Sequence, residues 1–187
     1  MEGNGDKQPW DGRLLLLNLC LTQVLVVLLA VGLLLVQGRL GVGLWTPAGV
    51  EMWVLGLFIG LTVVGLDGLV YRFLPRSWTD DGGLNRMLFE HMPVGWIAIV
   101  ALSAALAEEL LFRGALQYWL GIVGSSLLFT LIHFRYLKKW LLVLMVFGIS
   151  LVFGWMTDFS GSLVPAMCAH FVIDFLMGLL IRYGKVG

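Results

Sequence analysis

The chain has 187 residues, of which 59% are hydrophobic and 13% charged, and its mean hydropathy is +0.93. This composition excludes an ordinary water-facing globule, which needs more polar surface, and favours a membrane protein. The formal net charge is zero, so the sequence gives no indication of nucleic acid or of an acidic partner.

The first predicted elements are two membrane helices, at 14–36 and 50–71. Each is apolar over roughly 20 residues, the length that crosses the hydrocarbon core of a bilayer. The first is too long for the core of a signal peptide and lacks a small-residue cleavage site, so we expect it to remain as a membrane helix. Close helix packing is predicted at the glycines of the second helix, Gly56, Gly60, Gly65 and Gly68.

A polar connector at 76–92 leads to further apolar segments at 93–119, 122–134, 140–157 and 162–181. The segment 122–134 is shorter than a full span, and we expect the chain to turn near Gly121, just before it. The predicted fold class is all-α, a polytopic transmembrane helical bundle of about six membrane helices. Its expected organisation is an N-terminal two-helix region with the connector, 1–92, and a four-helix core, 93–187.

The basic residues predict the orientation of this bundle. With six spans and the N-terminus inside, ten lysines and arginines fall on the inner side and one, Arg39, on the outer side. Inner loops of membrane proteins carry such an excess of positive charge, so we expect the N- and C-termini to be inside. The inner residues are Lys7, Arg13, Arg72, Arg76, Arg86, Arg135, Lys138, Lys139, Arg182 and Lys185.

The most unusual stretch is 107–114, Ala-Glu-Glu-Leu-Leu-Phe-Arg-Gly, because it lies inside an apolar run. A charged side chain in hydrocarbon costs about 3 kcal/mol or more, so Glu108, Glu109 and Arg113 must face a protein interior or a wet cavity. In a helix, Glu109 and Arg113 are i,i+4 neighbours with the acid before the base, the favourable order. Glu108 lies about 100° around the helix and has no local cation. Glu108 is then available for chemistry, unless the cluster only fixes helix packing.

Three more polar residues fall in later spans: His133, His170 and Asp174. If the chain turns at Gly121, Glu108 is 13 residues before the turn and His133 is 12 after it, so both lie about 18–20 Å below it. Counted from the start of the last span, His170 lies about 14 Å deep and Asp174 about 20 Å deep. A lone histidine on an apolar helix is more often a packing residue, but packing residues have no reason to converge in depth. We interpret the four as one site in the cytoplasmic half of the membrane.

Such a set of side chains can bind and activate water. A glutamate serves as general base, and a histidine shuttles the proton or shares a metal ion. Two histidines with a carboxylate are also a plausible zinc set with an open position. The tentative metal ligands are Glu108, His133, His170 and Asp174. The His-Glu-x-x-His motif of soluble zinc proteases and the Gly-x-Ser-x-Gly motif of serine hydrolases are absent from the sequence.

Three motifs, in this order along the chain, resemble those of the CPBP intramembrane proteases, also called the Abi or CAAX-protease family. They are Glu108-Glu109-x-x-x-Arg113, Phe129-x-x-x-His133 and His170-x-x-x-Asp174. The family includes the type II CAAX prenyl endopeptidases, and residues 154–170 are also similar to its approach to the last motif. The resemblance covers about 93–181 and implies an intramembrane endopeptidase with its catalytic core at 93–187.

Carried over by motif position, the resemblance implies that Glu108 activates the attacking water with His133 as its partner. It implies that Glu109 and Arg113 brace the catalytic helix.

By the same resemblance, His170 and Asp174 stabilise the oxyanion or complete a metal site. The last motif of the family often ends in asparagine, whose amide can donate a hydrogen bond to an oxyanion, whereas an ionised aspartate cannot. Asp174 therefore has to be protonated or to act as a ligand, which slightly favours a divalent metal such as zinc. Family members are described both as metalloproteases and as glutamate-dependent proteases, so the metal stays open.

The resemblance implies a membrane peptide or protein as substrate, with a prenylated CAAX substrate only if the host makes one. We expect a multi-pass integral protein of the bacterial plasma membrane, in contact with the lipid bilayer and with no nucleic acid; its oligomeric state is open. The alternative is a non-proteolytic membrane scaffold or a proton-coupled carrier that uses the same buried carboxylates and histidines. Against a carrier, the sequence has no inverted repeat and no pair of broken helices.

Overall fold

The structure, a computed structural model, describes residues 12–46, 49–75, 78 and 83–186. Its helices are α1 (Gly12–Val36), α2 (Val50–Phe73), α4 (Leu84–Phe89), α5 (Val94–Glu109), α6 (Gln117–Ile132), α7 (Trp140–Ser160) and α8 (Val164–Arg182). Shorter elements are the 3₁₀ turns η1 (Val42–Trp45) and η3 (Phe134–Tyr136) and the π-helical segment η2 (Leu110–Leu116). No strand forms in the described residues, which confirms the all-α fold class. Lys7 and Arg76, counted above for the orientation, lie outside the described residues.

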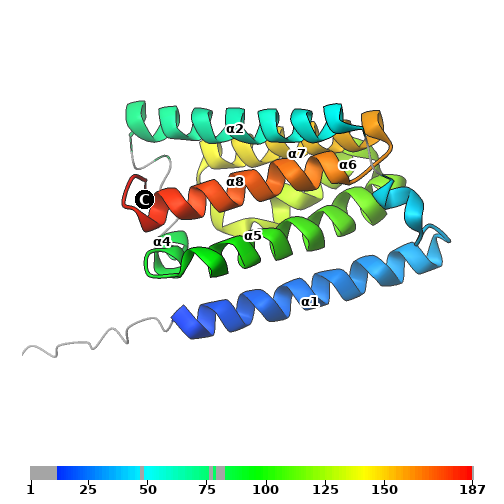
Figure 1. Cartoon of the computed structure of the whole chain (residues 1–187), viewed down its shortest axis with the longest axis horizontal. Coiled ribbons are helices and arrows are strands. Elements are labelled where there is room, and N and C mark those ends of the chain that lie inside the picture. Colours follow the sequence, from blue (N-terminus) through cyan, green and yellow to red (C-terminus); the bar gives the residue numbers. More distant parts are fainter. Residues whose placement is uncertain (1–11, 47–48, 76–77, 79–82, 187) are drawn as a thin grey trace, which may run out of the picture.

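The described residues contain five stretches that are long and apolar enough to cross a membrane. The longest, Val94–Ile132, has 39 residues and is interrupted at Gly121, where φ is 65° and ψ is 179°. Only glycine adopts these angles without strain, and they cannot continue a helix. The chain therefore turns at Gly121, and the part of α6 after this residue runs back antiparallel to α5 (Figure 1). This stretch supplies two passes, which confirms the predicted bundle of about six membrane helices.

Helix α8 lies at the centre of the bundle. It packs against α2 on one side and α5 on another, and it also contacts α7, while α6 packs on α7 (Figure 1). Helix α1 lies at the edge of the bundle, against α5 and η2. The first turn of α1 and the last turn of α8 lie at the same end of the bundle, as an even number of passes requires. That this end faces the cytoplasm stays a prediction.

The contact between α2 and α8 depends on glycine. A Cβ atom built on Gly56 would lie 2.6 Å from the carbonyl oxygen of Pro165, and one built on Gly60 would lie 2.8 Å from Cβ of Val172. The close packing predicted for these two glycines is therefore confirmed. For Gly65 and Gly68 the prediction is wrong, because a Cβ atom there would meet nothing within 4 Å. Of these four glycines, only the two in the first half of α2 are approached closely by α8.

The largest buried apolar cluster surrounds η2. It combines Phe112 and Ala115 of η2 with side chains from α1, α6 and α8. The members from these other helices include Ala30, Leu34, Phe129 and Met167. The charged residues at the end of α5 and in η2 consequently face a protein interior and not lipid, as their cost in hydrocarbon requires.

Candidate active site

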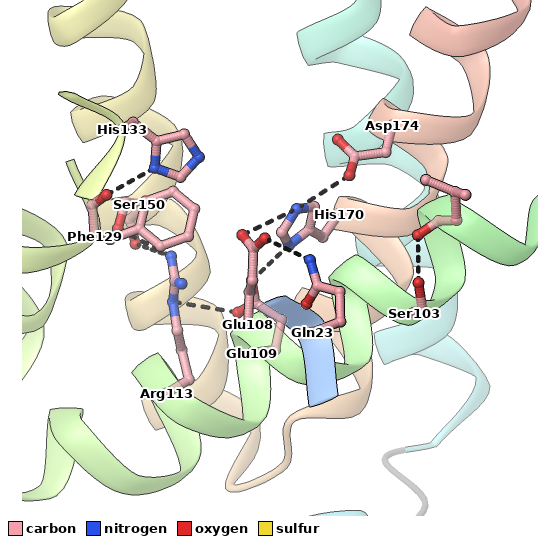
Figure 2. Close-up of polar contacts among 11 residues, drawn as sticks. Gln23, Ser103, Glu108, Glu109, Arg113, Phe129, His133, Ser150, His170 and Asp174 are labelled. Atoms are coloured by element: carbon pink, nitrogen blue, oxygen red, sulfur yellow. Dashed lines mark hydrogen bonds and ion pairs between the residues drawn. The ribbon is translucent and has the colours of Figure 1, made fainter. Parts of the chain in front are cut away.

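Polar side chains from α1, α5, η2, α7 and α8 converge beside the end of α5 (Figure 2). Glu108 and Glu109 are the last two residues of α5, and Arg113 lies one turn further on, in η2. His170 and Asp174 face them from α8. The convergence in depth that the sequence predicts is therefore present for Glu108, His170 and Asp174.

Glu109 and Arg113 form a buried ion pair. Arg113 Nε lies 3.2 Å from Glu109 Oε2, and their side chains are 1% and 0% exposed. This contact lacks the alignment of a hydrogen bond, but Arg113 Nη2 donates to Ser150 Oγ at 2.9 Å. The guanidinium is also flanked by the rings of Phe129 and Phe153, with centres 4.8 Å and 5.4 Å from Cζ. The predicted i,i+4 pair is confirmed, and its two charges compensate each other away from solvent.

The helix around Arg113 differs from the expected α-helix, because Leu110–Leu116 is π-helical. A π-helix closes its hydrogen bonds over five residues instead of four, so it widens the turn and re-aims the side chains that follow. The wide turn is held by burial: Leu110, Phe112 and Ala115 are all in the core. Such bulges occur often at functional sites, and this one directly follows the two glutamates.

His170 connects the two glutamates. Its Nδ1 lies 2.8 Å from Glu109 Oε1, and an ionised carboxylate only accepts hydrogen bonds, so the ring proton is assigned to Nδ1. The other nitrogen, Nε2, then faces Asp174 Oδ2 at 3.5 Å and Glu108 Oε2 at 4.0 Å. Glu109 thus fixes both the orientation and the tautomer of the imidazole, the arrangement in which a carboxylate prepares a histidine for proton chemistry.

Glu108 is the more accessible of the two glutamates. Its side chain is 18% exposed, against 0% for Glu109. Its Oε1 accepts a hydrogen bond of 3.4 Å from Nε2 of Gln23, in α1, while its Oε2 is the atom nearest His170. The two glutamates differ as the sequence predicts: Glu109 is neutralised by an arginine and Glu108 is not.

His133 stands slightly apart from these residues. Its Nδ1 lies 2.8 Å from the carbonyl oxygen of Phe129, which can only accept, so Nδ1 donates and Nε2 keeps its lone pair. The ring lies 4.6 Å from the ring of Phe129, centre to centre. Figure 2 shows it across the site from Glu108 and Asp174, and no ion pair joins it to these carboxylates, all of which the structure describes.

These residues were also predicted to form a zinc site, and their arrangement does not fit one. Among the described residues, no group of three His, Cys, Asp or Glu side chains is placed to hold a metal ion. The reason is visible in the contacts: His133, one of the four predicted ligands, stands away from the carboxylates. A divalent metal stays a prediction of the sequence.

Sequence reasoning missed several residues that contact this site, among them Gln23, Ser150 and Phe153. A signal existed for Gln23, since it is an amide within an apolar span, and polar groups there usually face the protein interior. No such signal marks Ser150 or Phe153, because serine and phenylalanine are common on every face of a membrane helix.

Comparison with known proteins shows the family of this chain. The family model for "Type II CAAX prenyl endopeptidase Rce1-like" matches residues 90–176, a range that contains both glutamates, the arginine, both histidines and Asp174. The chain is also 39% identical over 143 residues, 76% of each chain, to "Uncharacterized protein YpbD" of Bacillus subtilis (strain 168). The chain belongs to the type II CAAX prenyl endopeptidase Rce1-like family.

Membership has two consequences. The family is one of proteases, which supports a hydrolase and does not favour a scaffold or a carrier. With its apolar helices, it also makes the chain an integral membrane protein. Helices α1 and α2 lie outside the range that the family model matches. No solved structure matches the chain.

Proposed function

We propose that this protein is an intramembrane endopeptidase that hydrolyses a peptide bond of a membrane-associated substrate with water activated by Glu108. One observation supports this above all: Glu108 Oε2 lies 4.0 Å from His170 Nε2, while the other nitrogen of that ring is held by Glu109. A water molecule can lie about 2.8 Å from both atoms at once, which holds it between a base and an orienting histidine.

In the proposed reaction, Glu108 takes a proton from this water as its oxygen attacks the carbonyl carbon of the peptide. The carbonyl oxygen becomes an oxyanion. For this step His170 carries a second proton, taken up from solvent on Nε2 before the attack, so that Nε2 donates a hydrogen bond to the oxyanion while Glu109 and Asp174 balance the imidazolium charge. Collapse of the tetrahedral intermediate breaks the C–N bond. The proton on Glu108 then passes to the leaving nitrogen.

His133 serves this step as a second proton carrier. Its Nδ1 is fixed on the carbonyl of Phe129, so its free Nε2 can accept the second proton of the water, which the hydroxyl of the intermediate gives up as the product becomes a carboxylate. Arg113 acts indirectly, because it holds Glu109 and through it His170. The substrate is expected to be a membrane peptide or protein, prenylated at a CAAX terminus where the host makes one. The relative from Bacillus supports a bacterial plasma membrane as the location.

The test is cleavage by detergent-purified protein of a farnesylated CAAX peptide and of a panel of unprenylated membrane peptides. Glu108→Gln and His133→Ala are compared with wild type, and Glu51→Gln, an exposed carboxylate in the first turn of α2, is the matched control. Removal of a general base costs about 10²–10⁴-fold in rate, so we expect cleavage by wild type and the control and near-total loss in Glu108→Gln. Equal turnover by Glu108→Gln and wild type contradicts the proposal.

Two further measurements separate the remaining alternatives. Metal content and activity after a chelator test the zinc prediction: loss of activity that zinc restores supports a metal, and unchanged activity supports a reaction carried by side chains alone. Proton flux in liposomes that depends on Glu108, with no cleavage of any peptide, favours the carrier.

A further inference from the structure

Helix α1 carries one buried amide on the face that packs against the bundle, while its other faces are exposed. Gln23 is 8% exposed, whereas Leu21 is 54% and Leu25 66% exposed on the same helix. A buried amide costs free energy unless its groups are paired, so its position in an apolar helix needs an explanation.

The contacts of Gln23 point to the catalytic carboxylate. Its Nε2 donates to Glu108 Oε1 at 3.4 Å, whereas its own Oε1 is buried without a hydrogen-bond partner (Figure 2). Half of the amide is thus left unsatisfied in the interior, which disfavours folding. A side chain selected only for stability would be apolar here, because leucine or methionine fills the same space without this cost.

The two oxygens of Glu108 have different neighbours. Oε1 faces Gln23, and Oε2 faces His170 at 4.0 Å. An amide that donates to one oxygen fixes the rotation of the carboxylate and directs the other oxygen to the space beside the imidazole. That space is where the attacking water is proposed to lie.

The rest of α1 holds Gln23 at this level. Near its end, Ala30 and Leu34 are fully buried against η2. Directly after α1, Gln37 Nε2 donates to the carbonyl oxygen of Ala115 at 2.9 Å. Arg39 Nη1 donates to that of Gly114, also at 2.9 Å. These contacts fix the register of α1 along the catalytic helix, so Gln23 cannot slide away from Glu108.

We propose that Gln23 is a positioning residue for Glu108, and that α1 is therefore part of the active site and not only a membrane anchor. This inference rests on the proposed role of Glu108 as general base. The residue lies outside the range that the family model matches, so nothing in that match assigns it a role.

The test is the variant Gln23→Met, which keeps the length of the side chain and removes the amide. Its matched control is Thr22→Val, the neighbouring polar residue, which is exposed and bonds only within α1. We expect kcat to fall about tenfold or more in Gln23→Met with KM nearly unchanged, because the contact acts on the reacting group and not on binding. The thermal midpoint should change little, since the variant removes the unsatisfied Oε1 of Gln23 but also the donor to Glu108. Thr22→Val should match wild type in kcat, in KM and in the thermal midpoint.

A spectroscopic readout makes the test independent of cleavage. The infrared carboxylate band that disappears in Glu108→Gln is assigned to Glu108, and it should shift in Gln23→Met but not in Thr22→Val.

If wild type cleaves no peptide, the proposed function fails and this band alone decides whether Gln23 binds Glu108. If wild type cleaves, unchanged kcat and an unshifted band in Gln23→Met overturn the inference while the proposed function stands. A raised KM at unchanged kcat also overturns it. Should Gln23→Met not accumulate, Gln23→Asn, with an amide one methylene shorter, takes its place with the same expectations for kcat and for the band.

Discussion

The two helices at the periphery of the bundle, α1 and α2, look alike in sequence and attach to the core in different ways. Both are long, apolar and mostly exposed to lipid. Helix α2 joins α8 through Gly56 and Gly60, where the backbones approach closely and the contact is van der Waals packing. Helix α1 joins α5 through the contact of Gln23 with Glu108, and the segment after α1 adds the contacts of Gln37 and Arg39 with η2.

The difference separates a supporting contact from a functional one. In a bilayer, helices associate through small residues that allow close packing, and nothing in such an interface has to touch the chemistry. A polar group within a span is costly, and it is retained where it meets another polar group of the interior. The attachment of α2 is therefore expected to affect stability, and that of α1 to affect the reaction as well.

The largest effect on stability and cleavage is expected from replacing Arg113, which pairs with Glu109 in the candidate active site. Arg113→Met leaves Glu109 buried without its arginine, and breaking a buried ion pair in this way costs about 3–5 kcal/mol of unfolding free energy. Cleavage should also be lost, because Glu109 holds His170. Thermal unfolding in detergent measures the first effect. The double variant Glu109→Gln with Arg113→Met should recover part of the lost stability but not the cleavage. Equal stability of the single and double variants would contradict a coupled pair.

At the contact between α2 and α8, Gly56→Ala should lower the free energy of unfolding by about 1–3 kcal/mol, because the new methyl group meets a backbone carbonyl at 2.6 Å. The kcat of the folded fraction should stay close to that of wild type. The control is Gly65→Ala, where nothing lies within 4 Å and helix propensity predicts a change of at most about 1 kcal/mol, in the stabilising direction. A loss of kcat in Gly56→Ala as large as in Gln23→Met would remove the distinction between the two peripheral helices.

The smallest effect is expected outside the membrane spans, in α4. The hydrogen bond and charge of Arg86, at 3.1 Å, hold the pKa of the Glu90 carboxyl below its ordinary value. A carboxyl whose pKa is lowered on folding stabilises the protein at neutral pH, and this contribution disappears as the pH falls through the folded-state pKa. Glu90→Gln should therefore reduce the thermal midpoint slightly at pH 7 and not at all once the carboxyl of the parent protein is protonated. Because the pair is exposed, added salt should weaken it.

Much of the fold follows from the sequence. Apolar segments of sufficient length predicted the helices, and the short segment after Gly121 predicted the turn that the positive φ of this glycine makes. The spacing of Glu109 and Arg113 predicted their ion pair, since side chains four residues apart share a helix face. Counting residues from the turns predicted that Glu108, His133, His170 and Asp174 share one depth, because the rise per residue of a helix is nearly constant. The structure brings Glu108, His170 and Asp174 together and leaves His133 apart.

The sequence alone therefore determined the helices, the turn and the depth of each polar residue. Only the tertiary structure decided which way each side chain points and which helices are neighbours, since depth along a helix carries no information on its rotation or lateral position. Packing around η2 widened the helix at Leu110–Leu116, the carbonyl of Phe129 held His133 apart from the carboxylates, and the docking of α1 brought Gln23 to Glu108. These contacts join segments far apart in the chain, and they form only when the whole bundle is assembled.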